Sequence, residues 1–112
     1  MIESYSFGKI VINGKTYTSD VIVYLDRVKG SWWRKSGHLL QKDDINDVLQ
    51  YEPEILIVGT GAQGLMDITE ETKQLVKSKG IELIAKETDE ACRIYNELKK
   101  KRKVVAILHL TC

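Results

Sequence analysis

Three short apolar runs alternate with two helical patterns in the second half of the chain, and this order constrains the fold most. The runs lie at 55–59, at 81–86 and at 104–109. Between them, apolar residues recur at helical spacing. Because β-α-β units with apolar strands form parallel sheets with right-handed crossovers, we expect an α/β fold: a three-layer domain with a mixed central sheet.

The N-terminal part predicts a β-hairpin, because Asn13-Gly14 separates two runs that are rich in β-forming residues. We place its strands at 7–12 and 15–25. Residues 26–41 show no periodicity and indicate a loop. The chain, 1–112, has the length of one domain, and we expect a single one.

The predicted topology brings several loops to one edge of the sheet. The parallel strands would end there, and a helix predicted at 43–52 would begin there, so the loop "SWWRKSGHLL" before it would arrive at the same edge. Open α/β sheets bind ligands at this edge, where helix N-termini favour anions. The sequence therefore predicts a small electropositive concavity lined by Trp33, Arg34, His38, Gly59, Thr60, Gly61, Thr88 and His109.

The segment "EILIVGTGAQG" contains Gly59-x-Gly61-x-x-Gly64, the spacing of a dinucleotide-binding fingerprint. Glu87 ends the next strand, where an acid that binds a ribose would lie. Against this, the following helix begins at Thr69, after the glycines, and three parallel strands are too few for a full dinucleotide crevice. A nucleotide site, a site for another anion and a plain turn remain alternatives.

Catalytic chemistry has weaker support. Cys112 with His38 or His109 would supply a nucleophile and a base, but a thiol near a chain end is hard to hold, and no acid is placed to orient either imidazole. The spacing of these residues gives no support to a metal site. We therefore assign no catalytic residue, no metal and no cofactor. Enzymatic activity stays open, with a non-enzyme favoured.

The composition excludes several classes of partner. The chain has 17 basic and 16 acidic side chains, so its net charge of +1 favours neither nucleic acid nor an anionic membrane. Two cysteines make no disulfide framework and favour a reducing compartment. The first ten residues lack a signal-peptide pattern, and no apolar run approaches the ~20 residues of a spanning helix. We expect a cytoplasmic protein.

Four segments, "WWR…H", "ILIVGTG", "TDEACRIYN" and "ILHLTC", together resemble a family of small uncharacterised proteins. The family includes the adipogenesis-associated domain-containing protein and, more distantly, mitochondrial complex I assembly factor 3. The closing His109-x-Thr111-Cys112 and the pair Tyr95-Asn96 resemble the first branch most. The resemblance implies a three-layer α/β fold with an N-terminal hairpin and no established activity or cofactor. It implies action through partners for the mitochondrial relative.

Two functional hypotheses from different classes follow. The first is a non-catalytic interaction or assembly module that holds an unknown protein partner at Trp33, Arg34 and the neighbouring loops. The second is a protein or enzyme that binds an anionic small molecule or nucleotide against Gly59–Gly61 and Thr88. A deep pocket at the strand ends would favour the second, and a flat apolar surface related by a two-fold axis would favour the first. Homo-oligomerisation is left open.

Overall fold

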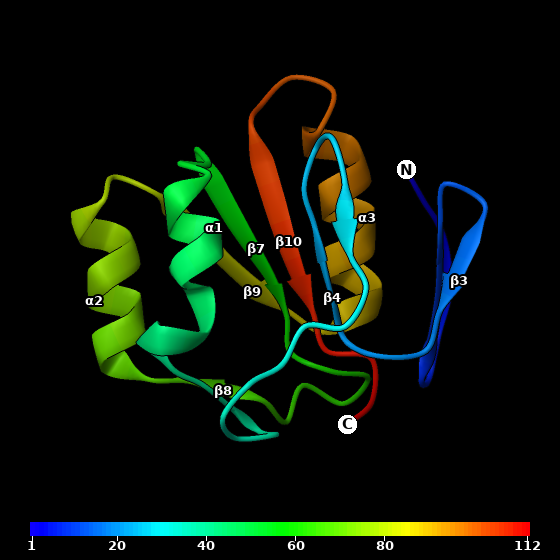
Figure 1. Ribbon diagram of the computed structural model, residues 1–112, viewed down its shortest axis with the longest axis horizontal. Coiled ribbons are helices and arrows are strands. Elements are labelled where there is room, and N and C mark those ends of the chain that lie inside the picture. The colour runs from blue at the N-terminus through cyan, green and yellow to red at the C-terminus, as the bar shows by residue number, and fades with distance from the viewer.

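The central sheet of the protein has five strands in the order β5-β4-β10-β7-β9, in a computed structural model that describes every residue of the chain (Figure 1). Strands β7 (Ile55–Gly59), β9 (Glu82–Lys86) and β10 (Val104–Leu108) are parallel. Strand β4 (Val21–Val23) pairs antiparallel with β10, and β5 (Val28–Lys29) pairs antiparallel with β4. The predicted mixed sheet and its parallel core are confirmed, and the bounds of the three parallel strands agree within one residue.

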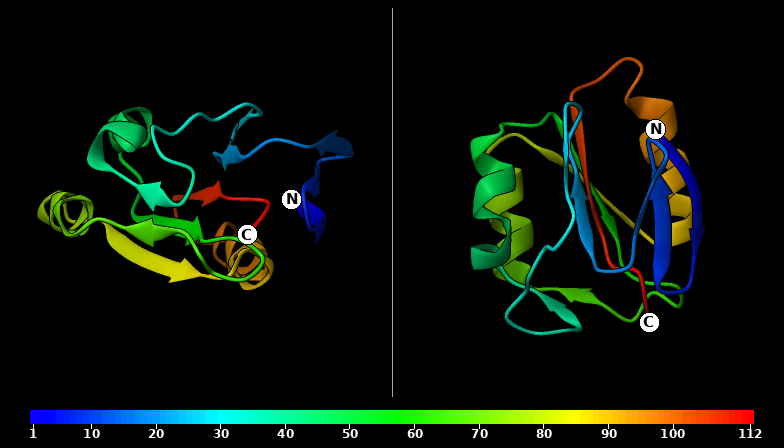
Figure 2. Two further views of the ribbon diagram at one scale, coloured as in Figure 1. Left: turned by 90° about the horizontal axis from the view of Figure 1, so that it is seen from below. Right: turned by 45° about the vertical axis from the view of Figure 1, so that its right-hand side comes forward.

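Helices cover both faces of this sheet (Figures 1 and 2). Helix α3 (Thr88–Leu98) lies on one face, and α1 (Asn46–Gln50) and α2 (Glu70–Ser78) lie on the other. The helix predicted at 43–52 is a 3-10 helix, η1 (Lys42–Ile45), that continues into the short α1. Parallel sheets need cover on both faces, and these helices supply it.

Burial on both faces explains why β7 is apolar at every position. Successive side chains of a strand point to opposite faces. Ile55 and Ile57 pack in a hydrophobic cluster with residues of α3, whereas Leu56 and Val58 pack in a second cluster with residues of α1 and α2. No side chain of the four is more than 2% exposed. The strand is therefore held by the core from both sides, and the loop that follows it has a fixed starting point.

The N-terminal hairpin differs in extent from the prediction. Strands β1 (Ile2–Ser6), β2 (Lys9–Ile12) and β3 (Lys15–Tyr17) form a separate antiparallel sheet. The first of them is absent from the prediction, and the strand expected at 7–12 begins two residues later. Asn13-Gly14 forms the predicted turn, with φ angles of 50° and 80° that suit a two-residue hairpin loop.

The continuous strand predicted at 15–25 is wrong. It divides into β3, in the N-terminal sheet, and β4, in the central sheet, with Thr18-Ser19-Asp20 between them. The chain changes sheets at this point because the Asp20 carboxylate accepts a hydrogen bond from Leu110 N–H at 2.8 Å, just beyond the end of β10. Alternation of apolar residues gave no sign of this long-range contact.

The loop predicted at 26–41 contains two short strands. One is β5, and the other is β6 (Leu39–Leu40), which pairs parallel with β8 (Asp67–Ile68). Asp67 N–H also donates to His38 O at 2.9 Å. This pairing joins the loop that carries Trp33 to the segment that follows the glycines, so both lie at the carboxyl edge of the sheet.

Candidate functional site

The carboxyl ends of β7, β9 and β10 meet along one edge, at the bottom of Figure 1. His109 N–H donates to Gly59 O at 3.0 Å. The Thr88 hydroxyl joins two loops, since it donates to His109 O at 2.6 Å and accepts from Gly61 N–H at 2.9 Å. Thr60 lies between the two glycines. The structure therefore places these five predicted site residues together.

Thr88 lies inside helix α3 and is not its cap. Glu87 is the N-cap residue of α3, and Thr88 is the first residue of the helix, with a fully buried side chain. A hydroxyl has one hydrogen to donate, and Thr88 donates it to His109 O. The side chain thus fastens the strand ends to each other. By contrast, Thr69 is the N-cap residue of α2, and its hydroxyl oxygen accepts from Thr72 N–H.

A buried network lies beside these strand ends and depends on Asp20, which no sequence pattern singles out. Arg34 Nη1 lies 2.5 Å from Asp20 Oδ2, and His109 Nδ1 lies 2.8 Å from the same oxygen. Leu110 N–H donates to the other oxygen. Arg34 also donates to the carbonyl of Gly37. The guanidinium group is therefore directed into the chain and away from any external anion.

The network sets the protonation state of Asp20. Burial alone would raise the pKa of this carboxyl, but hydrogen bonds from His109, Leu110 N–H and Arg34 outweigh it and lower the pKa to about 2. Because the carboxylate is ionised at neutral pH, Nδ1–H of His109 donates to it. The opposite ring nitrogen of His109, Nε2, is buried and has no hydrogen-bond partner.

His38 and Cys112 lie near this network. The rings of His38 and His109 are 6.0 Å apart between centroids and meet edge to face. Cys112 Sγ lies 3.9 Å from His38 Nε2, at the long limit for a hydrogen bond to sulfur. A base of a catalytic pair needs a third group to orient it, and no carboxylate bonds to the His38 ring. No three His, Cys, Asp or Glu side chains gather in a way that could hold a metal ion.

The glycine loop is occupied by the C-terminal segment of the same chain. Gly61 has a φ of 109°, and a Cβ atom there would lie 2.5 Å from Cys112 O. Ala62 N–H donates to Thr111 O at 2.7 Å, and Leu65 N–H donates to Cys112 O at 3.1 Å. These backbone N–H groups are the kind that would hold a phosphate. They are already bonded within the chain.

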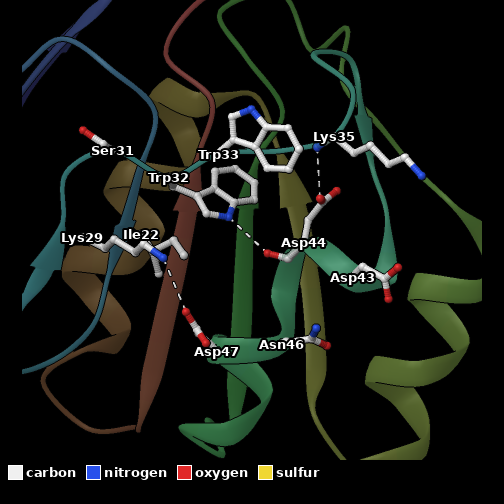
Figure 3. Close-up of a pocket in the computed structure, with 10 residues that line it drawn as sticks. All are labelled: Ile22, Lys29, Ser31, Trp32, Trp33, Lys35, Asp43, Asp44, Asn46 and Asp47. Carbon is white, nitrogen blue, oxygen red and sulfur yellow. Dashed lines mark hydrogen bonds and ion pairs between the residues drawn. The ribbon is translucent and has the colours of Figure 1, made fainter.

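Among the predicted site residues, only Trp33 lines a hollow in the surface (Figure 3). This hollow, which we call the Trp33 hollow, has a volume of about 380 Å³ and lies between the loop at 29–35 and the helices η1 and α1. The Trp33 side chain is 75% exposed. None of the surface hollows is lined by the predicted residues at the strand ends.

The floor and walls of the Trp33 hollow are held in place. Trp32 is buried and donates from Nε1 to Asp44 O at 3.1 Å, and Arg34 stacks over its ring. On the wall, Lys29 pairs with Asp47 at 3.4 Å. The acids in this wall come from the start of η1 and α1, where the sequence indicates helix-favouring residues and no binding role.

Replacing Gly61 with Val should destabilise the fold by ~2 kcal/mol or more, because the added side chain meets the backbone of the C-terminal segment at a φ that favours glycine. Chemical denaturation measures the change. Gly37 is the matched control, since a Cβ atom there meets nothing. We expect Gly37→Val to change stability by less than ~0.5 kcal/mol. Equal stability of the two variants would contradict the packing described for this loop.

The lowered pKa of Asp20 predicts that the free energy of unfolding decreases at acidic pH. Its folded pKa is below its unfolded value of 3.8, so its contribution is present above about pH 4 and is lost as the pH falls toward about 2. The contribution amounts to ~2 kcal/mol. The stability difference between the wild type and Asp20→Asn, from urea titrations at several pH values, should shrink across this window. Asp89→Asn, in an exposed ion pair with Arg93, is the control and should show little difference at any pH. A difference for Asp20→Asn that does not change with pH would contradict the network.

Three relatives of this chain are described as a hypothetical protein or by a location in a membrane. A conserved hypothetical protein from Pyrococcus horikoshii OT3 is 31% identical, with a TM-score of 0.87 over 100% of this chain and 99% of that one. A structure described as an outer membrane protein from Bartonella henselae is 26% identical, with a TM-score of 0.84 over 99% and 94%. A "13 kDa major membrane protein" of Francisella tularensis subsp. holarctica (strain LVS) is 27% identical over 95% of this chain and 86% of its own length.

These similarities support the α/β fold over the whole chain, since the Pyrococcus structure superposes on all of it. The longest helix, α3, has 11 residues, and no helix combines the length and the apolar character needed to cross a bilayer. The family model that matches covers residues 2–109 and therefore nearly the whole chain. The protein belongs to the family described as proteins of unknown function, DUF498/DUF598.

Proposed function

We propose that the protein is a non-catalytic interaction module that holds a protein partner at the Trp33 hollow. The observation that carries the proposal is the exposed indole of Trp33 beside a hollow with a fixed floor. Large aromatic side chains dominate the free energy of many interfaces when they fit a partner's pocket. Trp33 is 75% exposed in the isolated chain, so its burial against such a partner removes a large apolar area from water and favours binding.

The charges around the hollow indicate the chemistry of the partner. Asp43 is exposed, and its carboxylate has no ion pair or hydrogen bond within the chain, whereas the neighbouring Asp47 is paired with Lys29. An Arg or Lys side chain of a partner could stack on the Trp33 ring and face the Asp43 carboxylate. We therefore propose that the partner inserts a basic side chain with a long apolar stem.

The alternative hypothesis, an anionic ligand at the strand ends, has less support. The donors that it requires are used within the chain: Arg34 bonds to Asp20, the Thr88 hydroxyl bonds to His109 O, and the glycine-loop N–H groups bond to the C-terminal segment. A ligand would have to displace these bonds. We therefore favour a protein partner over a small anion.

The finer resemblance agrees with this proposal. The pair Tyr95-Asn96 and the closing His109-x-Thr111-Cys112 lead us to propose that the chain is nearest to the adipogenesis-associated branch of its family. The resemblance implies action through partners for the mitochondrial relative. The Tyr95 hydroxyl donates to Tyr24 O, and Asn96 bonds to both backbone groups of Ile2, so these two residues serve the fold and leave binding to other surfaces.

We also propose a cytoplasmic location, which two unpaired cysteines and a near-neutral charge support. Two relatives carry names that place those proteins in membranes. Fractionation of source cells distinguishes the two locations. We expect the protein in the soluble fraction at physiological salt. Recovery in a membrane pellet that resists a high-salt, alkaline wash would contradict the proposal.

Trp33→Ala should abolish partner binding without unfolding the protein. Truncating a central aromatic anchor costs ~2 kcal/mol or more, which lowers affinity roughly 30-fold. Quantitative affinity capture from native lysate measures the effect, and the direct test is titration of the captured partner with each purified variant. The matched control is Phe7→Ala, because Phe7 is also an exposed aromatic, at 64%, but lies in the turn between β1 and β2.

A partner that binds the wild type and Phe7→Ala equally, and Trp33→Ala at least ten-fold more weakly, is the expected result. Equal binding of the partner by all three proteins would contradict a role for Trp33 in binding. A thermal-shift screen with nucleotides and acidic metabolites tests the alternative, since a ligand at 100 times its dissociation constant adds ~2.7 kcal/mol of stability. A reproducible shift that Arg34→Met abolishes would favour the small-molecule hypothesis.

A further inference from the structure

We propose that the outer edge of β9 pairs with β9 of a second copy of the chain, antiparallel, so that two central sheets join into one. Strand β9 is the last strand of the sheet and pairs only with β7. The ribbon shows no element against its outer side (Figure 2, left). The surface is separate from the Trp33 hollow, which lies near the opposite edge of the sheet, so this proposal does not rest on the proposed partner.

Two backbone hydrogen bonds fix which groups of β9 face outward. Glu82 N–H donates to Glu54 O at 3.0 Å, and Thr60 N–H donates to Lys86 O at 2.9 Å. In a parallel pair, alternate residues bond to the neighbouring strand. The backbone N–H and C=O groups of Glu82, Ile84 and Lys86 therefore point toward β7. Leu83 and Ala85 therefore direct their N–H and C=O groups outward.

This edge lacks two of the features by which proteins often protect an exposed strand, a proline and a bulge. It runs for five residues without a proline or a bulge, and no hydrogen bond within the chain satisfies the outward groups of Leu83 and Ala85. Leu83 and Ile84 are half-buried, so apolar surface accompanies the free backbone groups. The other edge strand, β5, has only two residues. An edge with free backbone groups and no proline or bulge favours pairing with another strand.

The charges at the two ends of β9 favour a second copy as the occupant. With a two-fold axis at Ile84, Leu83 of each copy lies opposite Ala85 of the other, and four backbone hydrogen bonds form between outward groups. The same register places Glu82 opposite Lys86 of the second copy, twice. Both charged side chains are exposed and have no ion pair within the chain.

Neighbouring registers are less favourable. Centring the axis on Leu83 or on Ala85 keeps the outward groups aligned but sets Glu82 or Lys86 against Ile84, so the charge pairs are lost. An extended peptide of another protein could use the same edge. Such a peptide would not place a second Glu82 and Lys86 opposite the first pair. The experiment therefore changes these two charges.

The experiment measures the oligomeric state of the purified full chain by sedimentation equilibrium, up to about 0.5 mM, which detects even weak dimers. We expect a dimer. Glu82→Lys and Lys86→Glu each create two pairs of like charges, so each variant should dimerise roughly ten-fold more weakly or worse. The double variant restores opposite charges and should dimerise like the wild type. An equimolar mixture of the two single variants should form the heterodimer.

Ala85→Pro tests the backbone pairing independently. Its lost N–H faces outward, so the ladder to β7 is retained, and we expect a folded monomer with an unchanged circular dichroism spectrum. If this variant fails to fold, the charge variants decide. A monomeric wild type at 0.5 mM, single charge variants that dimerise as well as the wild type, or a double variant and a mixture that stay monomeric would each overturn the proposal.

Discussion

The Asp20 carboxylate is the interaction on which the carboxyl edge of this protein depends. It accepts hydrogen bonds from Arg34 on one long loop and from His109 and Leu110 just beyond β10. One side chain thus joins three segments that are far apart in the sequence. Hydrogen bonds from several donors favour the ionised form of a carboxylate. The bonds that order this edge therefore lower the pKa of Asp20 to about 2. The Arg34 charge is balanced inside the network.

The C-terminal segment closes the carboxyl edge of the sheet, so the ligand site that is typical of this fold is not open in this protein. Sheets of this topology commonly bind ligands outside the carboxyl ends of their strands. Here the C-terminal segment lies in that place, its carbonyls accept from Ala62 and Leu65, and Gly61 allows the close approach. The two proposed contacts use other surfaces, the Trp33 hollow and the outer side of β9.

Much of the fold can be predicted from the sequence, because the elements concerned depend on local patterns of residues. The three apolar runs fix the parallel strands, and the Asn13-Gly14 turn fixes a hairpin. The convergence of Gly59 and His109 follows from topology alone. The Asp20 network could not be predicted in this way, because its partners lie up to 90 positions away and their residue types have no characteristic spacing. The break between β3 and β4 has the same cause.

Amide hydrogen exchange in the glycine loop tests the closed edge most directly. Ala62 and Leu65 donate to the C-terminal segment, whereas the amide of Gln63, between them, has no hydrogen-bond partner and serves as an internal reference. We expect the first two amides to exchange slowly and Gln63 to exchange rapidly at neutral pH. Rapid exchange at all three would show that the C-terminal segment leaves the loop open. The N–H groups of the glycine loop would then be free to bind an anion, and the preference for a protein partner over a small anion would lose part of its support.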